Sequence, residues 1–192
     1  MKKEQSAVSK SVFRARLAGS ILAVLFPGCS LLAQQGGDTA EGLATAEVVE
    51  PIRATKLSDL AFGGVVVERD SGGAVRVPAD SSGVVHSGSA RPQCRAGGCE
   101  THPARFRVSG EADRVYRIHA PAAVTATGAL TGASLAVTDL TIRSDNAPDL
   151  AAGGRLDAEG RDRFALGGTL AVPAGTRPDY FRADIAVTVS YD

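Results

Sequence analysis

The residues best suited to chemistry lie close together in the middle of the chain: Cys94, Cys99 and His102. Two neighbouring cysteines in an exported protein normally oxidise, so we expect a Cys94–Cys99 disulfide that staples a Gly-rich loop. The closed loop is short, and the chain-entropy model assigns such a bond about 2–3 kcal/mol. Two alternatives stay open: free thiols, or a metal site that adds His102. Glu100 is the only local fourth ligand for that site, and zinc sites usually have a second cysteine pair elsewhere, so we expect no metal.

The chain has few residues of the types and spacing that form enzyme active sites. The three histidines are His86, His102 and His119, and no serine lies in a Gly-x-Ser-x-Gly motif. Most acidic residues occupy turns, where Asp favours the backbone geometry, so no pair of facing carboxylates stands out. The pairs Gly72-Gly73 and Gly167-Gly168 lack the Lys-Ser/Thr of a phosphate loop, and they predict a turn and a bulge. We therefore expect a protein that is not an enzyme and needs no cofactor.

The first 33 residues have the organisation of a secretory signal. Basic residues come first, an apolar run follows over Leu17–Phe26, and a Pro-Gly pair then breaks the helix. The predicted cut lies between Ala33 and Gln34, which makes residues 1–33 a signal peptide. A retained N-terminal anchor and a lipoprotein acylated at Cys29 are the alternatives. We expect export to the periplasm, the cell surface or the medium, and no membrane span in the mature chain.

Removal of the signal changes the charge of the protein. Five of the 21 basic residues and one of the 21 acidic residues lie in residues 1–33, so the mature chain has 16 basic and 20 acidic residues, a net charge of −4. A mildly acidic surface favours solubility and disfavours polyanions. The composition therefore predicts no nucleic-acid partner, and it leaves the identity of any other partner unknown.

Beyond a leader without periodicity (34–44), the chain alternates apolar and polar residues with a period of two. Phe164–Val172 and Phe181–Tyr191 show the pattern most clearly, and the second segment predicts one long C-terminal strand that closes the fold within the chain. The apolar phase switches within Ser134–Ser144, which predicts a one-residue bulge near Thr138-Asp139. Turn residues separate such segments about every ten residues. Residues 45–192 therefore predict a single antiparallel β-sandwich.

The order of several motifs resembles a bacterial family, the domain of unknown function (DUF) 4402. These motifs are Val49-Glu-Pro-Ile52, Leu60-Ala-Phe-Gly63, Phe106–Gly110, Tyr116–Pro121, Gly167–Ala174 and Val187–Tyr191. The resemblance implies an all-β fold: one immunoglobulin-like or pilin-like antiparallel sandwich over residues 45–192, preceded by a signal peptide. It implies no catalytic residues. Two segments depart from the family pattern, Arg91–His102 with its cysteines and Arg177–Tyr180.

These observations together predict an exported, non-enzymatic β-sandwich module with a structural or cell-surface role. Two other functions remain open: a module that binds a small ligand or a glycan, and a subunit of a pilus-like surface fibre. Other cell-surface proteins and glycans are the partner classes that such a module would meet.

Overall fold

The computed structural model describes residues 43–94 and 100–192, and the chain divides into two units, Met1–Thr45 and Ala46–Asp192. The second unit is described below. The predicted signal peptide and its cleavage site at Ala33 and Gln34 lie outside the described residues, as does Cys99. The described part of the chain contains strands and no helix, and so no helix that could cross a membrane.

The all-β prediction is confirmed. The strands in the described residues are β1 (Arg53–Ser58), β2 (Ala61–Phe62), β3 (Val65–Val66), β4 (Gly73–Val77), β5 (Val85–Gly88), β6 (Arg91–Pro92), β7 (Thr101–His102), β8 (Ala104–Ser109), β9 (Val115–His119), β10 (Val124–Gly128), β11 (Ser134–Ser144), β12 (Gly153–Arg155), β13 (Arg161–Val172), β14 (Phe181–Arg182) and β15 (Thr188–Tyr191).

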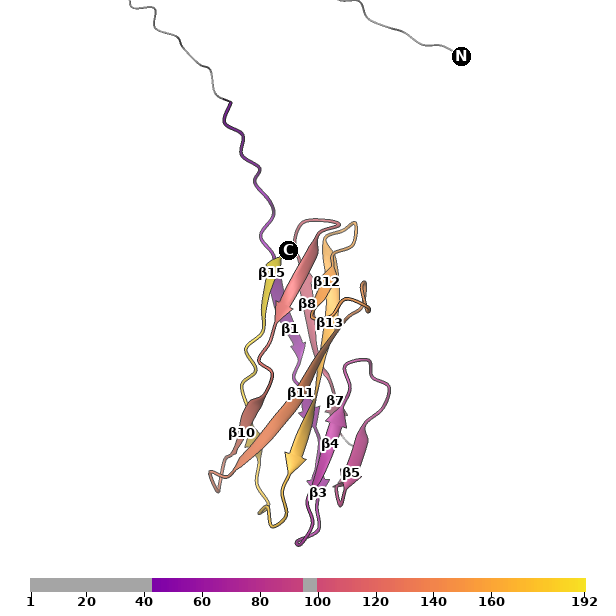
Figure 1. The fold of residues 1–192 in the computed structure, drawn as a ribbon, viewed down its shortest axis with the longest axis vertical. Coiled ribbons are helices and arrows are strands. Elements are labelled where there is room, and N and C mark those ends of the chain that lie inside the picture. The colour runs from indigo at the N-terminus through magenta and orange to yellow at the C-terminus, as the bar shows by residue number, and fades with distance from the viewer. Residues whose placement is uncertain (1–42, 95–99) are drawn as a thin grey trace, which may run out of the picture. The chain divides into compact units, whose positions relative to one another are not determined.

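The large sheet is built around β13, the longest strand (Figure 1). One edge of β13 pairs with β11 along most of its length, while the other edge pairs first with β8 and then with β4. The strand order is β1-β8-β13-β11-β10-β14, with β5 beside β4. A smaller sheet, β12-β9-β15, packs against β8 and the N-terminal half of β13. The pairs β2-β7 and β3-β6 form two separate two-stranded sheets. Every pairing is antiparallel, as the sequence pattern predicts.

The core follows the period-two pattern of the strands. Tyr116 and Ile118 of β9 face Val108 of β8 and Phe164 of β13, and Leu156 completes this buried cluster. The rings of Phe164 and its neighbour on β8 stack with centroids 4.8 Å apart. Burial of large side chains contributes about 1.5–3 kcal/mol each, so this cluster is a main source of stability for the two-sheet arrangement.

The predicted bulge is present in β11. The pairing with β13 shifts between Thr138 and Thr141, and Asp139 adopts a φ of 50°. One extra residue on β11 keeps Leu135 and Leu140 on the core side of the strand although they are an odd number of residues apart. Asp tolerates this left-handed conformation better than most residues do, because its side chain is short and polar.

Two expectations need correction. The segment Phe181–Tyr191 is not one strand: β14 pairs with the large sheet, β15 pairs with the small sheet, and the five residues between them belong to neither. The bulge predicted at Gly167-Gly168 has its extra residue on the neighbouring strand: the register shift lies opposite these glycines, in β11. A Cβ at Gly167 would collide with the backbone between Val77 and Ala79, so Gly is needed there for a close backbone approach.

Candidate functional site

Tyr116, Ser144 and Asp162 form the polar cluster that most resembles catalytic machinery. The Tyr116 hydroxyl donates to Asp162 Oδ2 at 2.8 Å, and Ser144 Oγ donates to the same oxygen at 2.6 Å. The three residues come from β9, β11 and β13, so the cluster joins the two sheets. Ser144 and Asp162 are the buried polar side chains among the described residues.

The hydrogen-bond partners of this cluster are used up inside the fold. Asp162 Oδ1 accepts from the backbone N–H groups of Asn146 (3.2 Å) and Arg163 (2.6 Å), and Ser144 Oγ accepts from Ala147 N–H at 3.0 Å. A Cβ at Gly154 would lie 2.5 Å from the Tyr116 hydroxyl, so the backbone of β12 packs closely against this hydroxyl. Burial and the adjacent carboxylate raise the pKa of Tyr116, so its hydroxyl stays a donor. The cluster therefore acts as a clamp between the sheets.

The histidines lie in three separate pairs of strands. His86 is half-buried in β5 opposite Val75, whereas His102 in β7 and His119 at the end of β9 are exposed. Among residues 43–94 and 100–192, no group of three His, Cys, Asp or Glu side chains could hold a metal ion. The Cys94–Cys99 disulfide remains a prediction, because Cys99 is not among the described residues.

A different feature stands out in the segment Ala183–Val187. Its side chains alternate between half-buried and exposed, as in a strand, yet within the described part of the chain its backbone makes no hydrogen bond. Ala183 and Val187 pack against the core clusters, so the segment is held in place by side chains alone. Its N–H and C=O groups are therefore available to another strand.

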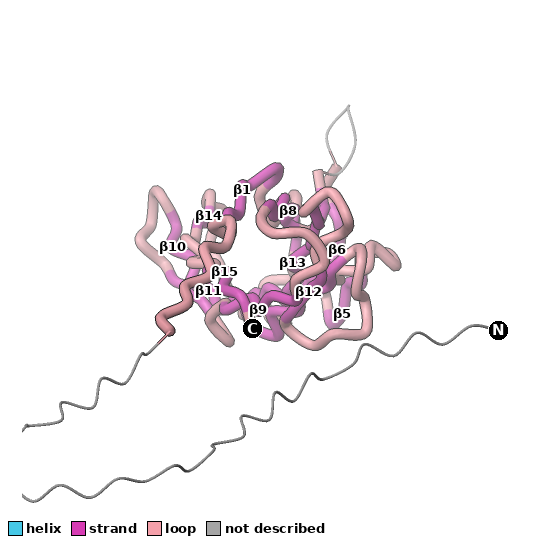
Figure 2. The backbone as a smooth tube through the Cα atoms, turned by 90° about the horizontal axis from the view of Figure 1, so that it is seen from above, coloured by secondary structure: helices cyan, strands magenta, loops and turns pink. Residues whose placement is uncertain are grey.

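The strand β1 forms one edge of the large sheet. The large sheet curls so that β1 and β14, its two ends, lie on the same side (Figure 2). Ala54 and Lys56 pair with Val108 and Phe106, which places both on the core side of the sheet, and both are nevertheless exposed. We call β1 together with Ala183–Val187 the open seam.

Strong polar contacts hold the open seam at both ends. At one end, the Asp179 carboxylate accepts hydrogen bonds from the backbone N–H groups of Leu130 (2.9 Å) and Thr131 (2.8 Å) at the tip of the β10–β11 hairpin. At the other end, the Tyr191 hydroxyl donates to the carbonyl of Glu50 at 2.7 Å and accepts from Glu111 N–H at 2.7 Å. The seam is therefore a defined edge between fixed points.

The N-terminal segment 43–50 is extended and lies outside every strand. Leu43 and Val48 are 92% and 95% exposed, although both are large apolar residues. Sequence reasoning placed Val48 within the folded domain and missed the open seam. Strict alternation shows which side chains face inward, but it carries no information on whether the backbone has a partner.

Comparison with known proteins agrees with this architecture. No curated protein and no solved structure matches the chain. A family model described as "Domain of unknown function (DUF4402)" matches residues 52–191, which include every strand of the described part. The chain therefore belongs to the DUF4402 family.

Proposed function

We propose that this protein is an exported, non-enzymatic structural module of the cell surface that joins other protein chains at its open seam. The observation that carries the proposal is that the backbone of Ala183–Val187 makes no hydrogen bond to the described residues, while Ala54 and Lys56 on the core side of β1 are exposed. A strand added there would gain main-chain hydrogen bonds and would cover apolar core surface. Domains normally protect such edges, so an edge left open between two fixed points indicates a binding function.

The N-terminal segment supplies a strand of suitable chemistry for a pilus-like assembly. Residues 43–50 lie outside every strand, and Ala44, Ala46 and Val48 alternate with the polar residues Thr45 and Glu47, which gives one small apolar face. Pro51 follows this segment and does not interrupt it. A second copy that donates residues 43–50 would make a head-to-tail contact, and such contacts propagate into fibres. The structure thus supports the surface-fibre alternative more than a site on the loops.

A proline substitution within Ala183–Val187 tests whether a strand of another chain pairs with this segment, because proline has no N–H to donate. Asp184 is exposed and its N–H has no partner among the described residues, so Asp184→Pro removes a donor without breaking any ladder bond of that part. Wild-type exported protein should form multimers as its concentration rises, and Asp184→Pro should remain monomeric in light-scattering measurements. The control Asp184→Ala keeps the N–H and should assemble like the wild type.

Hydrogen exchange gives a second readout. Amides of 183–187 should exchange rapidly in the monomer and become protected in the multimer or with a peptide of residues 43–52. A wild-type protein that stays monomeric at all concentrations, with no protection of 183–187 by the peptide, would refute strand addition. Export is tested separately: the intact mass of protein from the periplasm or medium should correspond to a chain that begins at Gln34.

A further inference from the structure

Seven arginines lie on the outer face of the large sheet. We call them the arginine face: Arg53, Arg76, Arg105, Arg107, Arg143, Arg161 and Arg163. All seven are exposed. They make up almost half of the 15 arginines in residues 34–192, although that part of the chain has a net charge of −4. The clustering is therefore a property of the fold and not of the overall composition.

The strand register groups most of these arginines into rows. Arg107 of β8 is directly opposite Arg163 of β13. Two residues further along β8, Ser109 pairs with Arg53 of β1 on one side and with Arg161 of β13 on the other. Successive outward positions on a strand are about 7 Å apart, so these guanidinium groups form closely spaced rows across neighbouring strands.

The same arrangement continues toward the other end of the sheet. Arg105 and Arg143 flank Ala165, one outward position beyond the Arg107 row. Arg76 lies further along, opposite Thr169 on β13. The arginine face thus extends from β1 across β8 and β13 to β11 and β4.

No member of the arginine face forms an ion pair within the described part of the chain, although Arg143 interacts electrostatically with Asp80. The ion pairs in the described residues are Lys56–Asp59, Glu111–Arg114 and Arg117–Asp192, and none includes a member of the arginine face. Like charges directly opposite each other in a sheet are destabilising. A direct Arg107–Arg163 pair therefore costs stability, which is typical of residues kept for binding.

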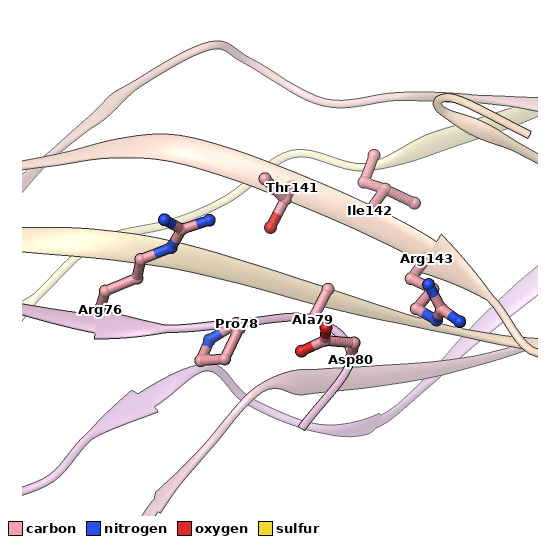
Figure 3. Close-up of a pocket in the computed structure, with 7 residues that line it drawn as sticks. All are labelled: Arg76, Pro78, Ala79, Asp80, Thr141, Ile142 and Arg143. Atoms are coloured by element: carbon pink, nitrogen blue, oxygen red, sulfur yellow. The ribbon is translucent and has the colours of Figure 1, made fainter. Parts of the chain in front are cut away.

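Two hollows lie along the arginine face. One, of about 200 Å³, has Arg76 and Arg143 at its two ends with Thr141 between them (Figure 3). The other, of about 590 Å³, is lined by Arg107, Arg161 and Arg163. The carboxylates that also line them are Asp80 in the first, and Asp145, Asp157 and the buried Asp162 in the second. Both hollows are therefore lined by arginines together with acidic side chains.

We propose that the arginine face binds a linear anionic polysaccharide of the cell envelope. Arg presents a planar fork of donors that fits carboxylate, sulfate and phosphate groups. Hydroxyl groups at the outward positions Thr55, Ser109 and Thr141 lie among the arginines and can bond to sugar hydroxyls. An extended polyanion can span several rows at once, which a single small anion cannot do.

The outward residues favour a polysaccharide over the other polyanions. Nucleic-acid surfaces combine basic residues with aromatic side chains that stack on bases, and this face has no aromatic residue at its paired outward positions. Membrane-binding surfaces add clusters of large apolar side chains, whereas the exposed ones beside this face are two separate residues, Val85 opposite Arg76 and Leu57 at the β1 bulge. This site is separate from strand addition, because it uses the outward side of the sheet.

The test measures binding of full-length mature protein to alginate, a polyuronate, and to heparin, a sulfated glycan. Both should bind at low salt and dissociate as salt rises. The double variant Arg107→Ser/Arg163→Ser should weaken binding by about tenfold or more, and its thermal stability should be unchanged or higher because a like-charge pair is removed. The control Arg69→Ser/Arg177→Ser makes the same change in net charge in exposed loops and should keep most of the affinity.

Three comparison ligands decide the class of partner: neutral dextran, duplex DNA, and vesicles of anionic phospholipid. Dextran should not bind, and DNA and vesicles should bind more weakly than the glycans. The proposal is overturned if neither glycan binds at low salt, if both double variants lose affinity equally, or if DNA or vesicles bind more tightly. Repeating the measurement with monomeric Asp184→Pro separates this result from strand addition.

Discussion

Replacing Tyr116 by Phe tests whether the Tyr116–Ser144–Asp162 cluster is a structural clamp. The substitution removes one hydroxyl and leaves the ring, which is fully buried. The hydroxyl donates to a buried carboxylate at 2.8 Å, and hydrogen bonds to charged groups contribute about 1.5–3 kcal/mol. Asp162 keeps its other three donors, so the loss should be about 2 kcal/mol, less than the roughly 3–5 kcal/mol that breaking a buried ion pair costs.

Urea denaturation followed by circular dichroism measures this loss. For a domain of this size, about 1 kcal/mol corresponds to about 2–4 °C in the melting temperature, so Tyr116→Phe should melt about 4–8 °C lower. Tyr180→Phe is the matched control. Tyr180 is 68% exposed and its hydroxyl has no partner in the described residues, so the same chemical change should alter stability by less than about 0.5 kcal/mol.

A double-mutant cycle assigns the effect to the carboxylate. In an Asp162→Asn background, Tyr116→Phe should cost at least about 1 kcal/mol less than in the wild type, because the charged acceptor is gone. Equal losses for Tyr116→Phe and Tyr180→Phe, or the absence of any coupling to Asp162, would contradict the clamp.

The clamp also predicts that the free energy of unfolding decreases at alkaline pH. The pKa of Tyr116 is raised in the folded protein, so the folded state favours the neutral phenol. This contribution is complete below the unfolded pKa of about 10 and is lost as the pH rises above it. Absorbance of tyrosinate should therefore show that Tyr116 ionises only as the protein unfolds.

The remaining predictions concern the hairpin anchor, a close backbone approach and the cysteines. Hydrogen bonds from Thr131 and Leu130 lower the pKa of Asp179 to about 2, so its stabilising contribution should be complete above about pH 4 and should disappear as the pH falls through 2; NMR titration of its carboxyl group measures this, and Asp179→Asn should abolish the dependence. Gly167→Ala should destabilise the domain by about 1–3 kcal/mol in urea, since its Cβ would meet backbone atoms that cannot move aside. Alkylation without reductant should label neither Cys94 nor Cys99 in exported protein; labelling of both, or zinc at one equivalent, would contradict the disulfide.

The sequence alone determined the fold class and the positions of the two long strands, β11 and β13. Alternation identified Phe164, Leu166 and Leu170 as inward residues of β13, and the odd spacing between Leu135 and Leu140 revealed the bulge at Asp139. These features are local: the side-chain period of a strand and the phase shift of a bulge can be read along one segment of chain.

The pairing partners could not be determined in this way. Phe181–Tyr191 has one regular pattern, but in the structure its two ends join different sheets and its middle joins none. The pattern of a half-buried segment depends on what its side chains face, whereas its backbone bonds depend on which distant strand lies beside it. The open seam was therefore invisible before the sheets were assembled.

The arginine face, like the open seam, depends on which distant strands pair with each other. The pairs Arg105-Phe-Arg107 and Arg161-Asp-Arg163 are visible in the sequence, and each predicts two arginines on one side of a strand. The total charge of the mature chain is acidic, so composition alone predicted a surface that repels polyanions. Only the register of β1, β8, β13 and β11 brings arginines from distant segments into neighbouring rows, because strand pairing converts sequence positions far apart into side chains a few ångströms apart.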